Sequence, residues 1–523
     1  MRAFFGYRFL LIAIYAYQGL AGPLDAADTK SGPTHIVVFD AGSSGTRIHV
    51  FNLYKRKDHG PLPVVDVSVR SKQTLKVKPG LSSFAEKLDL DGTKNGMLEL
   101  LDFANRFVPR SKRRSTPLLL KATAGLRAVK ASSAEAVLDT VRAVFRESEY
   151  QFIGPWVEII PGFEEGGLSW VAANYLKGTF NPKKGPSSKA STHDSESDSG
   201  SVGVLELGGG SLQVTLQVDA ARQLPIEDTF NFQIPQGRSY HVYAHSYLGF
   251  GQDYAQNAVM KKYGDVAKPG AAPPAPNNDP CYPKGYERRW SAAACEASGS
   301  SGGCADASSK IVKGTGESKK CYEMVSKFLK EGGPKAPGQY FVPPVRGQFI
   351  AIENFWYVRN DLKLPFDASA DARAKAVEKA CEENTASVNL DKPKKPKSCF
   401  ALSYQNALFD TLKARKSDGA DIDIIHELNG ADVDWALGAA IVHYIKKQNT
   451  VIVSDDAVKS YNSFLPAYIT TTAEIGGMII TMATLYVCVC RGLLFGQGKG
   501  LNGRPAHGIG LGVLGSNSGN KLV

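Results

Sequence analysis

The chain has 523 residues, more than one compact core usually holds, so we expect two lobes of roughly 150–200 residues each. Its hydrophobic fraction of 43% and charged fraction of 22% are ordinary for a globular protein and exclude disorder as its global state. The formal net charge of +11 is spread along the chain rather than gathered in one element. We therefore expect no nucleic-acid partner.

The two ends of the chain carry apolar segments. Residues 1–27 contain basic residues and then an apolar run, which is typical of a signal peptide or an uncleaved signal anchor. Residues 467–491 include the run IGGMIITMATLYVCVC and are predicted to form a transmembrane helix, with 492–523 as a disordered tail. These segments predict a membrane location in the secretory pathway, Golgi or cell surface, with the body of the chain lumenal or extracellular. Whether the leader is cleaved stays open.

Between these ends, short apolar runs alternate with segments of helical periodicity, which predicts an α/β architecture. Strands are expected at 34–39, 47–54, 118–120, 156–160, 202–207 and 212–218. Helices are expected at 134–145, 163–176, 370–380 and 434–446. Biased composition marks 178–203, expected to be a mobile surface loop, and also 268–280 and 291–309.

Two segments share one pattern: a β-run ends at an acidic residue, a glycine-rich turn follows, and a strand resumes. They are Val37–Arg47, with Asp40, and Val204–Gln213, with Glu206. Glycines let backbone N–H groups approach an anion, and a carboxylate at the strand end can hold a divalent cation through water. One such turn alone would be an ordinary hairpin. Two of them predict paired phosphate-binding turns that face one another.

Two more polar turns lie between these segments. Lys121–Arg127 follows a buried strand, and Arg127 taken alone indicates a structural ion pair. Pro161–Gly167 places Glu164 and Glu165 at the start of a helix, where acidic residues also serve simply to favour the helix N-terminus.

Together with Asn429–Gly438 (NGADVDWALG), these four segments resemble the five conserved regions of the ecto-nucleoside triphosphate diphosphohydrolase (apyrase) family, in intact order over about residues 34–444. The resemblance implies an α/β, two-lobed actin-like (ribonuclease H-like) fold with a nucleotide cleft between the lobes. The first lobe would comprise 34–163 plus 436–463, and the second 164–435.

The resemblance also implies an activity: hydrolysis of the terminal phosphates of nucleoside tri- and/or diphosphates, by metal-assisted in-line attack of water. Glu165 would be the general base, with Glu164 as second choice, and Ser211 and Gln213 would orient the water. Asp40 and Glu206 would hold Ca²⁺ or Mg²⁺ through water ligands. The phosphate-binding residues would be Ser43, Ser44, Gly45, Thr46, Thr123, Gly208, Gly209, Gly210 and Ser211. Arg127 and Trp170 would brace the site, and Asp432 and Trp435 would close the cleft.

This chain departs from the family pattern at two positions. Glu206 stands where the family usually has Asp, and Gly249 stands where animal cell-surface members have a cysteine. Six cysteines lie between the terminal apolar segments, an even number that suggests three disulfides. The resemblance implies the pairs Cys281–Cys321 and Cys381–Cys399, which leaves Cys295 with Cys304.

Other readings stay open at this point. An exopolyphosphatase shares the two glycine-rich turns, and a catalytically inactive binding relative would share the fold. A kinase of the same superfamily fits the secretory leader poorly. Trp356 or Tyr357 is a candidate contact for the nucleobase, and His245 is expected to be structural. The motifs do not decide between triphosphates and diphosphates, between bases, between calcium and magnesium, or between oligomeric states.

Overall fold

A computed structural model of the chain describes residues 26–68, 73–180, 200–235, 237–263, 278–290, 310–332, 336–340, 342–364, 370–382 and 398–449. Most of the predicted signal segment (1–25), the predicted transmembrane helix and the tail lie outside these residues, as do 181–199, 268–277, and the segment with Cys295 and Cys304. Within the described ranges, no helix has both the length and the apolar character needed to cross a membrane.

The first of two large sheets is built from the N-terminal part of the chain. Its strands are β1 (Thr34–Gly42), β2 (Gly45–Tyr54), β3 (Val64–Val65), β4 (Thr74–Val77), β5 (Leu118–Ala122) and β6 (Val157–Ile159). Their order is β3-β2-β1-β5-β6, and β4 pairs with β2 off this path. Strands β1 and β2 form an antiparallel hairpin, whereas β5 is parallel to β1 and β6 is parallel to β5. The predicted hairpin is thus confirmed.

The second sheet repeats this arrangement. Its strands are β7 (Gly203–Leu207), β8 (Ser211–Gln217), β9 (Thr229–Gln233), β10 (Ser239–Leu248), β14 (Gly347–Glu353) and β15 (Ala420–Ile424). They lie in the order β15-β14-β7-β8-β10-β9. Here too the first strand, β7, forms a hairpin with β8 on one side and pairs in parallel with β14 on the other. The registers match as well, since Asp40 lies opposite Arg47 and Glu206 lies opposite Gln213.

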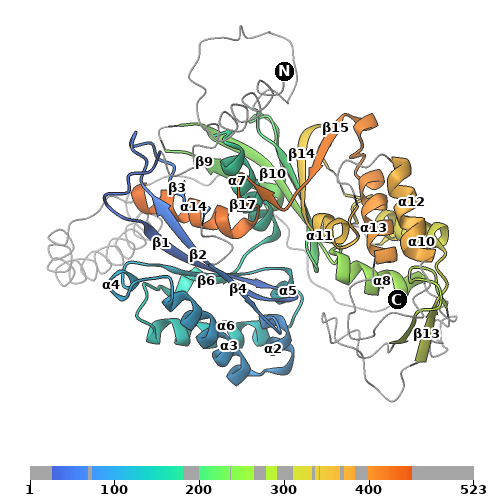
Figure 1. Cartoon of the computed structure of the whole chain (residues 1–523), viewed down its shortest axis with the longest axis horizontal. Coiled ribbons are helices and arrows are strands. Elements are labelled where there is room, and N and C mark those ends of the chain that lie inside the picture. The colour runs from blue at the N-terminus through green and yellow to red at the C-terminus, as the bar shows by residue number, and fades with distance from the viewer. Residues whose placement is uncertain are drawn as a thin grey trace, which may run out of the picture. The chain divides into compact units, whose positions relative to one another are not determined.

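Helices cover both sheets and also separate them (Figure 1). Those of the first part are α2 (Leu81–Lys87), α3 (Leu90–Asn105), α4 (Arg110–Arg113), α5 (Ala124–Arg127), α6 (Ala131–Glu147) and α7 (Gly162–Lys177). Those that follow are α8 (Gln252–Tyr263), α10 (Ser318–Glu331), α11 (Asn354–Asp361), α12 (Ala370–Glu382), α13 (Ser398–Thr411) and α14 (Trp435–Asn449). Two small sheets complete the fold: β11 (Asn278–Asp279), β12 (Glu287–Trp290) and β13 (Lys310–Gly314), and the hairpin of β16 (Glu427–Leu428) and β17 (Ala431–Asp432).

The side chains of β1 show how the layers arise. Val37 and Phe39 point to one face and pack with α3 and α6, whereas Ile36 and Val38 point to the other face and pack with α7 and α14. A strand buried on both faces reads as a continuous apolar run, as this one does. The second sheet likewise buries Leu205 against α10 and α13 and turns Val204 towards α7 and α14.

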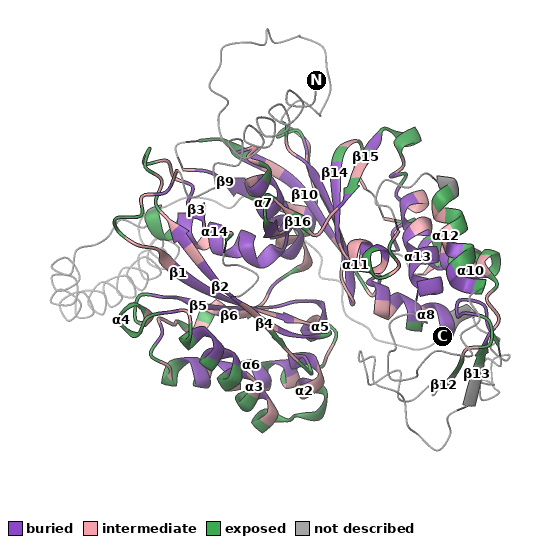
Figure 2. Ribbon diagram, in the orientation of Figure 1, coloured by how far each residue is buried: buried purple, intermediate pink, exposed green. Residues whose placement is uncertain are grey.

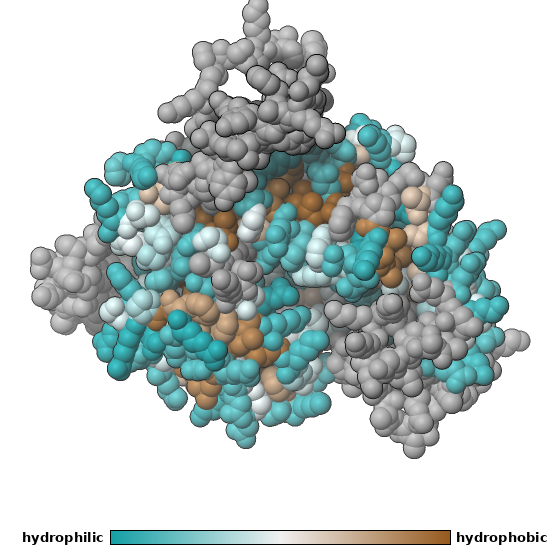
Figure 3. Space-filling view, viewed as in Figure 1, coloured by the Kyte–Doolittle hydropathy of each residue, from teal (hydrophilic) through white to brown (hydrophobic). Residues whose placement is uncertain are grey.

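Helices α7 and α14 therefore form a central layer that contacts both sheets, and both are largely buried (Figure 2). The close approach of the two helices depends on Gly438, since a Cβ added there would lie 1.9 Å from the carbonyl oxygen of Leu168. Helix α7 has no polar face after its first turn, which is typical of a helix surrounded by protein. Among the residues coloured in Figure 3, hydrophilic side chains are prominent at the outer edges of the visible face, and hydrophobic ones lie further in.

The structure confirms the α/β class and the expected strands and helices, with ends that differ by a few residues. It also forms the disulfides Cys281–Cys321 and Cys381–Cys399, as the resemblance implied. The proposed boundaries of the two lobes stay a prediction.

Candidate active site

The site lies where the central strands of both sheets end. Strands β1 and β5 of the first sheet are parallel, as are β7 and β14 of the second. Their carboxyl ends carry Asp40, Thr123, Glu206 and Glu353. In open α/β sheets, ligands bind in the crevice outside the carboxyl ends of the strands. Both sheets thus contribute polar residues to a single region.

The two glycine-rich turns face one another across this region, as the sequence predicts. A Cβ added at Gly209 would lie 2.9 Å from Ser43 Oγ, and one added at Gly210 would lie 2.9 Å from Ala124 Cβ. The second turn therefore needs its glycines because Ser43 of the first turn and Ala124 lie against them, whereas Gly45 of the first turn is crowded by Lys76 and Val77 of β4. Peptide groups that remain uncovered by side chains can donate their N–H groups to an anion.

A pocket of about 640 Å³, including its opening to solvent, lies at these turns. The predicted residues that line it are Asp40, Ser43, Ser44, Gly45, Thr123, Glu165, Glu206, Gly208, Gly209, Gly210, Ser211 and Trp435. Side chains from both halves of the chain thus converge on one cavity.

The remaining predicted residues do not line this pocket. Thr46 is buried beneath the first turn, and Trp170 is fully buried in the central core, where it packs against Phe180 and Tyr240. Gln213 and Arg127 touch residues that do line the pocket, as described below.

Glu165 combines burial with a cationic partner. It lies in the first turn of α7 and only 6% of its surface is exposed. Burial raises the pKa of Glu165, while Arg127 and, to a smaller extent, the Gln213 amide oppose that rise. Arg127 donates from Nη2 to Glu165 Oε2. A carboxylate with a raised pKa that still opens into a cavity suits proton transfer.

The neighbouring Glu164 has a different environment. Its Oε1 pairs with Lys121 Nζ at 3.0 Å, and the same ammonium group contacts Glu158 at 2.6 Å. Glu164 does not line the pocket, and its side chain is 29% exposed. The two carboxylates therefore differ in both direction and partner.

Ser211 and Gln213 form a hydrogen-bonded group beside Glu165. Gln213 Nε2 donates to Ser211 Oγ at 2.7 Å and to Ser246 Oγ at 3.2 Å. Gln213 Oε1 is buried and accepts no hydrogen bond from the residues that the structure describes. A buried acceptor without a donor calls for an explanation, and a bound water is one.

Asp40 and Glu206 face the same pocket from the two sheets. Burial raises the pKa of Asp40 to about 7, Arg47 opposes that rise, and Glu165 and Glu353 add to it. Burial and the nearby Glu165 also raise the pKa of Glu206, whose Oε2 accepts a hydrogen bond from Ser169 Oγ at 2.5 Å. Crowded buried carboxylates are oxygen ligands of the kind that calcium and magnesium prefer, so the donor set fits a hard cation.

The spacing of the pocket carboxylates bears on how such a cation would be held. Among the described residues, one group of three side chains has potential metal-ligand atoms within 4.8 Å of one another: His426, Glu427 and Asp432. None of the three lines the pocket. No such group of three forms from the described pocket carboxylates, an arrangement that suits a cation retaining its own water ligands.

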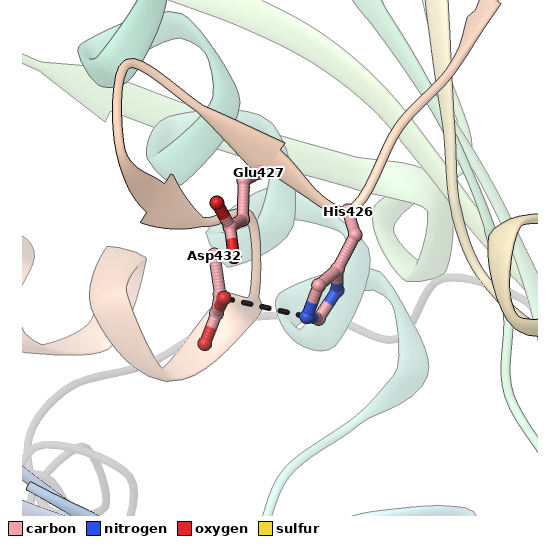
Figure 4. A group of neighbouring side chains, drawn as sticks. All are labelled: His426, Glu427 and Asp432. Atoms are coloured by element: carbon pink, nitrogen blue, oxygen red, sulfur yellow. Dashed lines mark ion pairs between the residues drawn. The ribbon is translucent and has the colours of Figure 1, made fainter. Parts of the chain in front are cut away.

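The His426 group also accounts for Asp432. All three side chains belong to the β16–β17 hairpin and the residue before it (Figure 4). Asp432 Oδ1 lies 3.4 Å from His426 Nε2, and the His426 ring stacks on Trp356 with 4.6 Å between centroids. The structure thus places Asp432 against His426 instead of on the pocket wall. Trp356 and Tyr357, the candidate base contacts, also lie off that wall.

His245, expected to be structural, lies in β10 away from the pocket. It is buried and hydrogen-bonded through Nδ1 to Asp228, and its ring stacks on Tyr340.

Five charged or titratable residues on the wall were given no role by the sequence analysis: Arg47, His49, Lys76, Glu353 and Asp434. Two of these five residues could have been found from the sequence. Arg47 follows Asp40 at the same offset as Gln213 follows Glu206, and Asp434 lies within the fifth conserved region. No sequence pattern pointed to Glu353, because it reaches the site only through the pairing of β14 with β7.

Comparisons with known proteins agree with this geometry. The model of the GDA1/CD39 (nucleoside phosphatase) family matches residues 27–458. The chain is 31% identical over 424 residues to "Probable apyrase 6" of Arabidopsis thaliana, covering 77% of this chain and 71% of that protein. It is 28% identical to "Ectonucleoside triphosphate diphosphohydrolase 1" of Mus musculus, covering 77% and 79%.

A solved structure supports the fold. The nucleoside triphosphate hydrolase of Neospora caninum superposes with a TM-score of 0.58 over 80% of this chain and 93% of that one, at 16% identity. The fold is therefore the two-lobed actin-like type. On the family match, which spans most of its length, the chain belongs to the GDA1/CD39 (nucleoside phosphatase) family.

Proposed function

We propose that this protein hydrolyses the terminal phosphates of nucleoside tri- and diphosphates, with Glu165 as the general base. The observation that carries the proposal is the meeting of two glycine-rich turns and the buried, pocket-facing carboxylate of Glu165 in a single cavity. Family membership supports phosphatase chemistry, and the named relatives are an apyrase and a nucleoside triphosphate diphosphohydrolase.

The two turns would bind the phosphates. Backbone N–H groups and hydroxyls of residues 43–45 would hold one phosphate, those of 208–211 another, and Thr123 would contact the terminal one. Phosphoryl transfer depends mainly on positioning and on stabilisation of charge, which such turns supply.

Glu165 would accept a proton from the attacking water. The oxygen of that water forms the new bond to the terminal phosphorus while the bond from phosphorus to the bridging oxygen breaks. Orthophosphate and a nucleotide shorter by one phosphate leave. Ser211 and Gln213 would orient the water, and the buried Gln213 Oε1 is an acceptor suited to that task. General-base assistance of this kind contributes about 10²–10⁴ in rate.

Enzymes of this family generally depend on a divalent cation. Asp40 and Glu206 would hold its water ligands, and the Glu206 carboxylate is kept in place by Ser169. When bound, calcium or magnesium would offset negative charge on the phosphate oxygens. The secretory-pathway location also belongs to this proposal, because both apolar terminal segments lie outside the described residues.

The test is phosphate release from the purified full chain with ATP, ADP, GDP, UDP and AMP side by side, with and without calcium or magnesium. We expect metal-dependent release from the tri- and diphosphates and none from AMP. Release from polyphosphate alone would replace this proposal with an exopolyphosphatase. A folded chain that releases no phosphate from any of them would indicate an inactive binding relative.

A further inference from the structure

Arg47 occupies an unusual place in the pocket. It lies on β2 opposite Asp40 and reaches the pocket wall. Within the described part of the chain, its guanidinium makes no hydrogen bond and no ion pair shorter than 4.0 Å. Its five N–H donors are therefore available to a ligand.

Three carboxylates nevertheless act on this guanidinium from a distance. Burial alone would lower the pKa of Arg47, but Glu353, Asp40 and, more weakly, Asp434 outweigh that effect and raise it. They come from three separate elements: β1, the junction of β14 with α11, and the residue before α14. These carboxylates thus favour the charged guanidinium from a distance, although none of them bonds to it directly.

Two of these carboxylates have other contacts or a proposed role of their own. Asp434 Oδ1 accepts a hydrogen bond from the Leu437 backbone N–H at 2.9 Å and so caps α14, while its Oδ2 lies 3.9 Å from His49 Nδ1. Asp40 belongs to the proposed cation site. Glu353 makes no side-chain hydrogen bond to any described residue, and among the neighbouring charges Arg47 has the largest effect on its pKa.

The backbone at Glu353 gives independent support. Its φ is 60° and its ψ is −122°, a conformation that L-residues other than glycine rarely adopt. It is the last residue of β14, directly before α11, and it lines the pocket. Strained residues of this kind cluster at active sites, where the surrounding structure holds them in place. Glycine would fit the backbone better, so a glutamate here needs a reason.

We propose that Glu353 is a positioning residue that directs the Arg47 guanidinium into the pocket, where Arg47 binds the phosphate chain of the nucleotide. The inference rests on the proposed function and adds two residues to it. A carboxylate beyond ion-pair distance orients the guanidinium without occupying its donors. Those donors can then bind two phosphate oxygens at once, which the ammonium group of a lysine cannot do.

The first experiment measures kcat and KM for ADP in Arg47→Gln, Arg47→Lys, Glu353→Gln and the double variant Arg47→Gln/Glu353→Gln. We expect Arg47→Gln and Glu353→Gln each to raise KM by about 10- to 100-fold, because a hydrogen bond to a charged group is lost. The KM of Arg47→Lys should stay close to that of Arg47→Gln. The double variant should be no worse than Arg47→Gln alone, since Glu353 acts through Arg47. Fully additive losses would overturn the proposal.

A second readout separates positioning from a structural role. Glu353→Gly relieves the backbone strain, so its melting temperature should equal or exceed that of the wild type while its KM rises as in Glu353→Gln. Guanidinium ion added to Arg47→Ala should lower its KM, and methylammonium should not. The matched control is the surface pair Arg142 and Glu135 on α6, whose Gln variants should keep the wild-type KM.

The outcomes distinguish this inference from the proposed function. A wild-type chain that hydrolyses no nucleotide defeats both. A wild-type chain that hydrolyses ADP, together with Arg47→Gln and Glu353→Gln variants whose KM stays within about twofold of it, defeats only the role of Glu353 and Arg47.

Discussion

The change of Glu165 to glutamine tests the proposed base most directly. Glutamine keeps the size of the side chain and an oxygen that can still accept from Arg127 Nη2, but it cannot take a proton from water. We expect kcat to fall by about 10²–10⁴ with little change in KM, which corresponds to about 2.7–5.4 kcal/mol of transition-state stabilisation.

The expected effect of this change on stability follows from burial. Only 8% of the Glu165 side chain and 14% of the Arg127 side chain are exposed. Deleting one partner of a buried pair costs about 3–5 kcal/mol, because the other charge is left without compensation. The amide of Glu165→Gln retains the hydrogen bond, and the raised pKa of Glu165 means that burying its charge is itself unfavourable. The two effects oppose one another, so we expect a small change in melting temperature.

The assay is phosphate release at saturating ADP and ATP, with melting temperature as a folding check. Glu164→Gln is the matched control, since it changes the adjacent residue in the same way but removes a partner of Lys121 outside the pocket. Its kcat should stay within about threefold of the wild type, because a partly exposed ion pair contributes little. A larger loss of kcat in Glu164→Gln than in Glu165→Gln would rule out Glu165 as the base.

Three further predictions follow. Asp40→Asn should raise the calcium or magnesium concentration needed for half-maximal phosphate release, and a chelator should abolish release by the wild type; unchanged metal dependence would contradict the cation site. Arg127 lowers the pKa of Glu165, and the base is lost as pH falls through that pKa. Arg127→Gln should therefore shift the acidic limb of the kcat–pH profile to higher pH. An unshifted limb would count against this pairing. Gly438→Ala should lower stability to thermal unfolding by about 1–3 kcal/mol, whereas Gly96→Ala on α3, with 3.9 Å to its nearest neighbour, should leave it equal or higher.

Local patterns of the sequence were sufficient to predict several elements of the fold. The β1–β2 hairpin was predicted because apolar residues flank a turn rich in glycine and serine, and α6 because its apolar residues recur with helical spacing. Helix α13 was missed because eleven of its residues are buried, and a helix buried on all sides has no periodic polar face. Helix α3 was missed as well, and its two interior glycines lower the local helical signal.

The residues of the candidate site likewise fall into those that local patterns predicted and those that they did not. The sequence indicated the residues of the two turns and Glu165, because each lies in a short segment with its own chemical pattern. It did not indicate that Thr46 is buried off the pocket wall or that Asp432 lies against His426, since these depend on which face a side chain takes and on what packs beside it.

Local sequence patterns were enough to predict the α/β class, the two glycine-rich turns and the family resemblance, because each of these depends on contiguous segments of the chain. The sequence predicted that the turns face one another, but how closely they meet depends on α7 and α14 packing between two sheets, which becomes visible in the fold. Only the tertiary structure decided that Glu353 joins the pocket. A parallel strand pair is joined by a long crossover, so its members come from distant parts of the sequence, and no local pattern records which side chains will meet at their ends.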